Sequence, residues 1–320
     1  MRFFIFLFLL STNAFACNFC MLGQGVNPYL TGSNQGLTIA ADYASSDTTY
    51  IGKSEVAGNG KKETWNTYSL TGFFSPLSDL TILITLPYAS KTNIDYDSGS
   101  SLNTGTVVEG FGDVSVTGRY TLLTEHSIES TFVLGVLGGV KAPTGSTSIY
   151  AIGGAAVDRH VLPGTGSWDF DTGISSSYAK ASGFQATLDA VYRFAGKGLW
   201  AGREHRFGDS LNYGAKLYQR VLRTEAGASF FPFLGISGET TGKETGAVLA
   251  DSSYSTSTKN PSTGGTVLFA NLGVYAPLSA NTILNLGYAK AFYHQMNYDA
   301  NFDADPAEKF RLNFSLTYLL

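Results

Sequence analysis

The residues with the clearest capacity for chemistry lie near the N-terminus, where Cys17 and Cys20 form a Cys-x-x-Cys pair. Attachment of a c-type haem would require histidine after the second cysteine, and Met21 stands there instead. A zinc site would need further ligands, but the chain has no other cysteine. In an oxidising compartment the pair favours a local disulfide. Lipid modification of Cys17, to which Ala14 and Phe15 are poorly matched, and a redox dithiol remain as alternatives.

The four histidines do not indicate a catalytic site. His160 and His205 fall in expected loops, where no serine or carboxylate stands at a fixed spacing from them. His126 and Ser127 are adjacent, but they lie in an expected short turn between two strands. We therefore expect no enzyme activity, and we interpret the loop histidines as solvent-exposed side chains.

One segment resembles the opening of a calcium-binding loop, because acidic and amide side chains alternate at Asp299, Asn301, Asp303 and Asp305. A calcium loop of the EF-hand type needs glycine at its sixth position and glutamate at its twelfth. Here those positions hold Ala304 and Phe310. We expect a solvated acidic loop, and the sequence predicts neither a metal nor a cofactor.

The composition excludes several classes of protein. Charged residues make up 14% of the chain, against about 25% in typical soluble domains. Aromatic residues make up 13%, with 37 glycines and a net charge of -4, which is unlike a disordered chain. The 21 Lys and Arg against 25 Asp and Glu leave no basic excess for binding nucleic acid.

The first sixteen residues are typical of a secretory signal peptide. Arg2 precedes the unbroken apolar run Phe3 to Leu10, and Ala14-Phe15-Ala16 supplies small residues before a cleavage site. That run is too short to cross a bilayer, which needs about twenty apolar residues. We expect residues 1–16 to be removed on export, so that the mature chain starts at Cys17.

From residue 36 onward the hydrophobic pattern has a period of two, which indicates β-strands. Leu37, Ile39, Ala41 and Tyr43 form one face of the first strand, while Thr38, Ala40 and Asp42 form the other. The pattern recurs down the chain and predicts about twelve strands. Short turns such as 75–78 and 124–127 alternate with long connections, although the connection 220–229 is longer than this rule expects.

An even number of antiparallel strands, joined alternately by short and long connections, is typical of an outer-membrane β-barrel with short periplasmic turns. We therefore predict an all-β fold, a single antiparallel up-and-down transmembrane β-barrel over residues 36–320. Residues 17–35 would form an N-terminal periplasmic or plug segment. The alternative is an exported β-sandwich, in which the apolar faces of two sheets pack against each other.

The distribution of charge favours the barrel, because the apolar faces of the strands carry almost no charged residue at their centres. Aromatic residues such as Tyr88, Trp168, Tyr192 and Phe310 fall near one end of the strands, and Tyr120, Tyr178 and Tyr318 near the other, as interfacial girdles require. The charged residues that we predict to line the lumen are Asp42, Asp113, Arg119, Lys141, Asp169, Asp171, Asp189, Arg193, Lys216, Arg220, Glu239 and Arg311.

Three segments carry a resemblance to a known family: Gly110 to Val114, Gly138 to Gly145, and Leu162 to Asp169. In this order and spacing they resemble the outer-membrane barrels linked to the meta-cleavage pathway of phenol degradation. The resemblance covers roughly residues 35 to 320. It implies an outer-membrane location and the passage of small, often aromatic or hydrophobic, molecules, but it carries over no individual site residue.

Two functions follow as expectations. The first is a channel or transporter in contact with outer-membrane lipid. Its solute would be a small molecule, which the sequence does not identify. Its pore should be narrow, since twelve strands lie between barrels filled by side chains and water-filled porins. Because acids and bases balance along the predicted lumen, we expect no strong ion selectivity. The second is a closed barrel that recruits a protein partner through its cysteine-bearing segment or its long loops.

Overall fold

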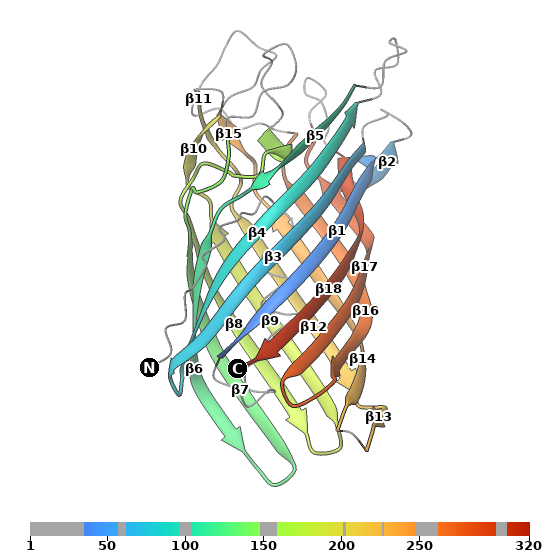
Figure 1. The fold of residues 1–320 in the computed structure, drawn as a ribbon. Coiled ribbons are helices and arrows are strands. Elements are labelled where there is room, and N and C mark those ends of the chain that lie inside the picture. Colours follow the sequence, from blue (N-terminus) through green and yellow to red (C-terminus); the bar gives the residue numbers. More distant parts are fainter. Residues whose placement is uncertain are drawn as a thin grey trace.

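The computed structural model describes residues 35–56, 62–95, 104–147, 159–200, 203–225, 227–246, 262–298 and 306–320. Twelve long strands in these ranges form one closed antiparallel β-barrel (Figure 1). They are β1 (Gln35–Ile51), β3 (Lys62–Leu77), β4 (Leu80–Asp95), β6 (Ser115–His126), β7 (Ser130–Lys141), β8 (Asp169–Lys180), β9 (Phe184–Phe194), β12 (Ser210–Gln219), β14 (Ser229–Thr241), β16 (Gly265–Pro277), β17 (Thr282–Met296) and β18 (Pro306–Leu319).

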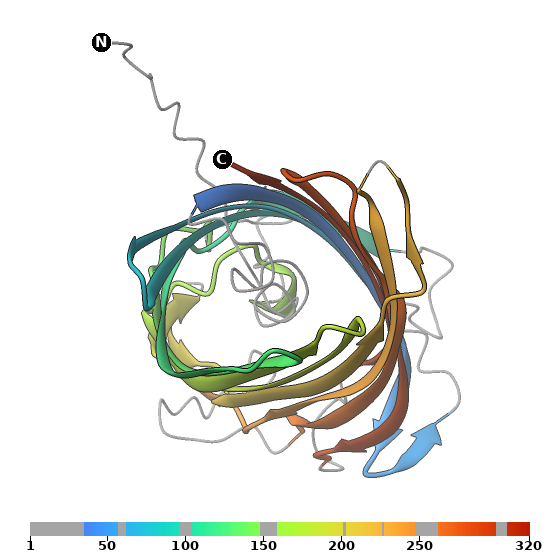
Figure 2. The same cartoon turned by 90° about the horizontal axis from the view of Figure 1, so that it is seen from below.

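The wall closes without an edge, because each long strand pairs with the next one along the chain and β1 pairs with β18. The closing register runs from Gly36 opposite Leu319 to Thr49 opposite Pro306. Figure 2 shows the resulting ring in a view along the barrel. The predicted fold class is therefore confirmed, and the β-sandwich alternative is excluded.

Short and long connections alternate as predicted. The short turns and both ends of the wall lie on one rim, where the N–H of Leu320 donates to the carbonyl of Gln35; we call it the periplasmic rim. The longer connection after β12 holds a small strand, β13 (Leu222–Arg223), paired with the start of β14. The connections at the other, extracellular rim contain β2 (Ser54–Val56), β5 (Thr104–Phe111), β10 (Lys197–Trp200), β11 (Arg203–Arg206), β15 (Thr245–Gly246) and the short helix η1 (Arg159–Val161).

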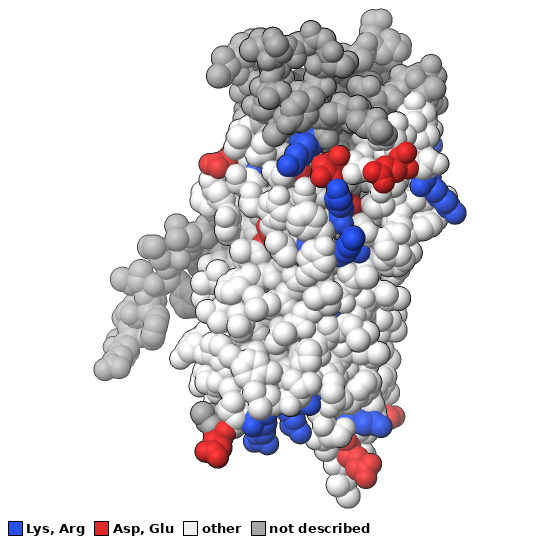
Figure 3. Space-filling model, turned by 90° about the vertical axis from the view of Figure 1, so that its right-hand side faces the viewer, with Lys and Arg blue, Asp and Glu red and all other residues white. Residues whose placement is uncertain are grey.

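Strand alternation separates an apolar outer face from a mainly polar inner one. On β1, Ile39 is 56% exposed on the outside, while Thr38 and Ala40 are buried on the inside. Figure 3 shows charged side chains gathered near the two ends of the barrel, with an uncharged band between them. An outer-membrane barrel needs such an apolar band, about 25 Å tall.

Aromatic residues border this band. Tyr120 and Tyr318 are about half exposed near the periplasmic rim, and Trp168 and Phe170 are similarly exposed near the other rim. Within the described residues, no helix is long and apolar enough to cross a membrane.

Candidate functional site

The extracellular half of the barrel interior contains a segment of the connection between β7 and β8, residues 159–168, which we call the strap. Val161, Leu162 and Pro163 of the strap are buried, and Figure 2 shows this yellow-green segment inside the ring of strands. Lys91 on β4 anchors it: the Lys91 ammonium donates to the carbonyl oxygens of His160 at 2.8 Å and Leu162 at 3.3 Å. The strap therefore narrows the lumen at the extracellular side.

A buried ion cluster fixes the base of the strap to the wall. Lys141 Nζ lies 2.8 Å from Asp113 Oδ2 and 2.8 Å from Asp169 Oδ2, and all three side chains are at most 5% exposed. Thr165 joins them, since its backbone N–H donates to Asp113 Oδ2 at 2.9 Å and its hydroxyl contacts both Asp113 and Lys141. One cation is thus shared by two carboxylates whose remaining oxygens are also hydrogen-bonded, as a buried ion group requires.

The three sequence segments that carry the family resemblance meet at this cluster. Their glycines pack backbone against backbone: a Cβ on Gly145 would lie 2.6 Å from Gly164 Cα and 2.7 Å from Gly112 Cα. Such contact is too close for any side chain, so only glycine fits there. The register places Ser115 opposite Lys141 and Lys141 opposite Asp169, which is why segments far apart in sequence converge here.

A second contact joins the strap to the connection between β14 and β16. His160 Nε2 lies 2.9 Å from Glu244 Oε1, and the His160 ring meets Phe207 edge-on at 6.1 Å between centroids. The backbone N–H of Glu244 donates to Thr263 Oγ1 at 2.9 Å. The extracellular closure is thus built from several loops that hold one another in place.

Below the strap, paired charges line the inner wall; we call this layer the ion belt. Arg193 makes a bidentate pair with Asp171 at 2.7 and 2.8 Å between adjacent strands. Arg311 contacts Glu308 and lies 3.0 Å from Glu239 Oε2. Charges of both signs stand together here, so the ion belt presents no ring of a single sign of the kind that selects ions.

Part of the interior at the periplasmic end is apolar. Tyr218, Phe231, Phe233 and Tyr275 are each less than 9% exposed on the inner face, and they form one buried cluster with Phe73, Leu83, Ile283 and Leu319. We call this cluster the aromatic layer. Its rings are in contact, with centroids 5.1 Å apart for Tyr218 and Phe233. Phe233 lies over Gly273, where a Cβ would come within 2.5 Å of the ring.

Of the predicted lumen residues, Lys216 borders the aromatic layer, and Arg119 lies within electrostatic reach of the same acid, Asp189. Lys216 Nζ lies 5.4 Å from the centroid of the Phe233 ring, and Arg119 Nε donates to Ser175 Oγ at 2.9 Å. Asp189 interacts electrostatically with both cations. A small cluster of charge therefore stands at the junction between the ion belt and the aromatic layer.

The structure places all of the predicted lumen charges on long strands except two. Asp113 precedes β6 but is fully buried. Arg220 follows β12 at the periplasmic rim, where its guanidinium donates to the carbonyl of Ala181 at 3.3 Å. Asp42 on β1 accepts a hydrogen bond of 2.6 Å from Asn313. Cys17, Cys20 and the acidic segment 299–305 lie outside the described residues.

Sequence reasoning missed several buried ionisable residues and the whole aromatic layer. Lys91 lies on the inner face of β4, three residues beyond the outward Tyr88. Extending the alternation of this strand by three residues would therefore have identified it. Glu308 was missed because a register shift between Ser45 and Ser46 interrupts the pairing with β18, so that the alternation of β18 side chains changes face there. Phe231 and Phe233 alternate with the outward Leu234 and Ile236, but an inner face had been expected to be polar.

Comparison with known proteins supports the same architecture. No family model and no curated protein matches the chain. Among solved structures it is similar to an outer membrane channel from Pseudomonas putida F1, with 16% identity, a TM-score of 0.59, and coverage of 89% of this chain and 96% of that one. The protein is a barrel of the bacterial outer membrane. At this sequence identity the similarity establishes the fold alone.

Two further solved structures are similar to the chain at lower TM-scores. The CymD monoaromatic hydrocarbon channel shares 10% identity at a TM-score of 0.43, covering 96% of this chain and 94% of that one. The transport unit of the autotransporter AIDA-I from Escherichia coli shares 9% identity at a TM-score of 0.47, covering 93% and 94%.

Proposed function

We propose that this outer-membrane barrel is a narrow channel for small molecules with apolar or aromatic parts. The observation that supports it most directly is the aromatic layer, formed by Tyr218, Phe231, Phe233 and Tyr275 at the periplasmic end of the lumen. A water-filled porin has a polar interior, whereas an apolar constriction excludes water and ions. A solute that offers its own apolar surface replaces the lost contacts and so passes more easily than an ion.

The two ends of the lumen differ in chemistry, and this suggests the order of events along the path. A solute entering from outside first meets the strap and then the paired charges of both signs in the ion belt. It leaves through the aromatic layer, where aromatic rings stack edge-on or offset with a gain of about 0.5–1.5 kcal/mol per pair. The channel would thus favour aromatic over purely polar solutes of equal size.

The test uses vesicles that contain the protein and an enclosed phosphatase. Nitrophenyl phosphate and glycerol phosphate carry the same charged group, but only the first has a ring, and neither crosses lipid readily. We expect vesicles with the wild-type protein to admit the aromatic ester severalfold faster than the aliphatic one, read as hydrolysis by the enclosed phosphatase relative to its rate on each ester in opened vesicles. The double variant Phe231→Ala/Phe233→Ala should lose this preference and conduct ions more strongly. Lys91→Met, which releases the strap, should raise the rates for both esters.

The second candidate function is a closed barrel that recruits a protein partner. It is favoured by the packing at both ends, since the strap and the aromatic layer each fill part of the interior. The same vesicles separate the two: if the wild-type protein, Lys91→Met and the aromatic double variant all fail to pass either ester, the channel is rejected.

A further inference from the structure

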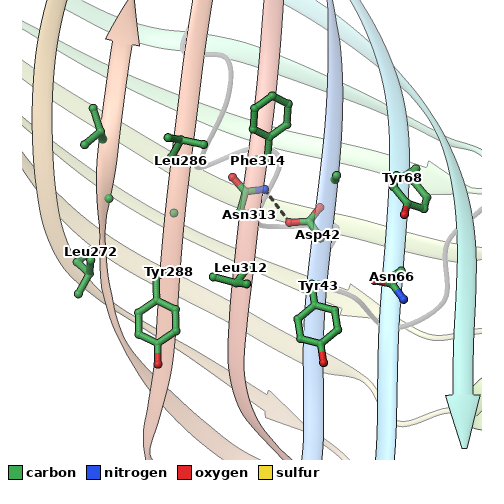
Figure 4. A pocket seen from close by; sticks show the side chains of 14 residues that line it. Asp42, Tyr43, Asn66, Tyr68, Leu272, Leu286, Tyr288, Leu312, Asn313 and Phe314 are labelled. Carbon is green, nitrogen blue, oxygen red and sulfur yellow. Dashed lines mark hydrogen bonds between the residues drawn. The ribbon is translucent and has the colours of Figure 1, made fainter.

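The outer face of the barrel carries an apolar groove of about 390 Å³ that crosses the seam between the first and last strands. It lies between two rows of outward side chains (Figure 4). One row includes Tyr43, Leu312 and Tyr288, and the other includes Tyr68, Ala41 and Phe314. The register sets Ala41 between Tyr68 on β3 and Phe314 on β18, so the smallest side chain leaves a gap between two large rings.

Cations stand at the extracellular edge of this groove. Lys290 is exposed on the outer face of β17, two residues and therefore about 7 Å beyond Tyr288. Its opposite residue on β18 is Phe310, whose ring centroid lies 5.7 Å from Tyr43 and 6.1 Å from Tyr288. An aromatic group thus connects Lys290 to the groove.

A second lysine adds to the positive charge. Lys309 precedes Phe310 and is 54% exposed, with Nζ 3.3 Å from Asp47 Oδ1. Among the described residues in these contacts, two cations stand against one carboxylate, which is an excess of one positive charge. Among the described residues, no ion pair neutralises Lys290. Figure 3 shows charged side chains above the uncharged band on this side of the barrel.

From this juxtaposition we infer that the groove is a binding site for a phosphorylated lipid of the outer leaflet. Because Lys290 and Lys309 lie toward the extracellular rim, a lipid of that leaflet presents its phosphate at their height and its acyl chains to the apolar band. The lysine ammonium binds phosphate as a point charge. A neutral lipid would fill the groove but leave the excess charge without a partner.

This site depends only on the barrel lying in a membrane, so its test is independent of the proposed channel. The mature protein is reconstituted in nanodiscs of phosphatidylcholine, and the binding of diphosphorylated lipid A is measured by native mass spectrometry. We expect Lys290→Gln/Lys309→Gln to weaken binding at least severalfold, and Ala41→Leu to weaken it by filling the gap. The matched control is Lys180→Gln, which removes an exposed lysine at the periplasmic end.

Further measurements distinguish the loss of a lipid site from a folding defect and from simple charge attraction. Lys290→Arg keeps the charge and should retain binding, and all variants should show the heat-dependent gel mobility of the wild-type barrel. Lipid A without phosphates should bind the wild-type protein as weakly as the phosphorylated form binds the double variant. Equal lipid A binding by the wild-type and double-lysine proteins would overturn the site, as would unchanged binding by Ala41→Leu.

Discussion

At the scale of single residues, Lys141 holds the strap because its ammonium pairs with two buried carboxylates at once. Removing it as Lys141→Met leaves Asp113 and Asp169 buried without a cation, and breaking a buried ion pair costs about 3–5 kcal/mol. We expect that loss in the free energy of unfolding, measured by urea titration in lipid vesicles, together with faster proteolysis of the strap.

Replacing the whole group separates the cost of an unpaired charge from the value of the cluster. In the variant Lys141→Met/Asp113→Asn/Asp169→Asn no charge is left unpaired, so most of the stability should return. If Lys141→Met alone is as stable as the wild-type protein, the cluster does not secure the strap.

Asp209 lies in the extracellular connection between β9 and β12. From its surroundings we predict that the local stability of this connection depends on pH. Burial tends to raise the pKa of its carboxyl, but hydrogen bonds from Arg206 and from the backbone N–H of Ala195 outweigh burial and lower the pKa below the usual 3.8. A lowered pKa means that the ionised form stabilises the fold above the usual value. That stabilisation is lost only as the pH falls below 3.8 through the lowered pKa.

Hydrogen exchange of the Ala195 amide, corrected for its intrinsic rate, measures this effect. We expect protection to persist at pH 5 and to fall only in strong acid, whereas Asp209→Asn should be less protected at pH 5 and insensitive to acid. A wild-type amide that loses protection between pH 6 and pH 5 would contradict this assignment.

At the scale of elements, the strand pattern was predictable because one face of every strand must meet hydrocarbon. That constraint fixes which residues face outward, as Ile39 and Leu234 illustrate. It says less about the inner face, where a residue need only fit its neighbours. Phe233 faces inward because Gly273 on the next strand makes room for its ring, and such a pair is not visible in the alternation of a single strand.

The strap was not predictable from periodicity, since loops have none. Its anchors were nevertheless partly accessible. Adjacent antiparallel strands bring the region before Ser115 beside Lys141 and Asp169 at the extracellular rim, and the three resembling segments contain these positions. The sequence could therefore have grouped Asp113, Lys141 and Asp169 as one cluster, rather than treating them as separate lumen charges.

At the scale of the whole molecule, the outer face of the barrel must contact lipid and the inner face must not. A matched pair of substitutions on β14 tests this requirement. Leu234 is 65% exposed on the outer face, whereas Ser237 lies on the inner face and accepts a hydrogen bond of 3.0 Å from Asn271. Arginine on a lipid face near the bilayer centre costs roughly 2–4 kcal/mol. We therefore expect Leu234→Arg to lose about that much unfolding free energy in vesicles, and Ser237→Arg to lose less.

Detergent provides the control for this comparison, because the penalty at Leu234 arises from moving a cation into bilayer hydrocarbon and should shrink when the micelle lets water reach the side chain. The cost at Ser237 depends on packing inside the barrel and should be similar in both media. If Leu234→Arg were the milder substitution in vesicles, the exposed leucines would not face hydrocarbon, and both the channel and the lipid site would lose their basis.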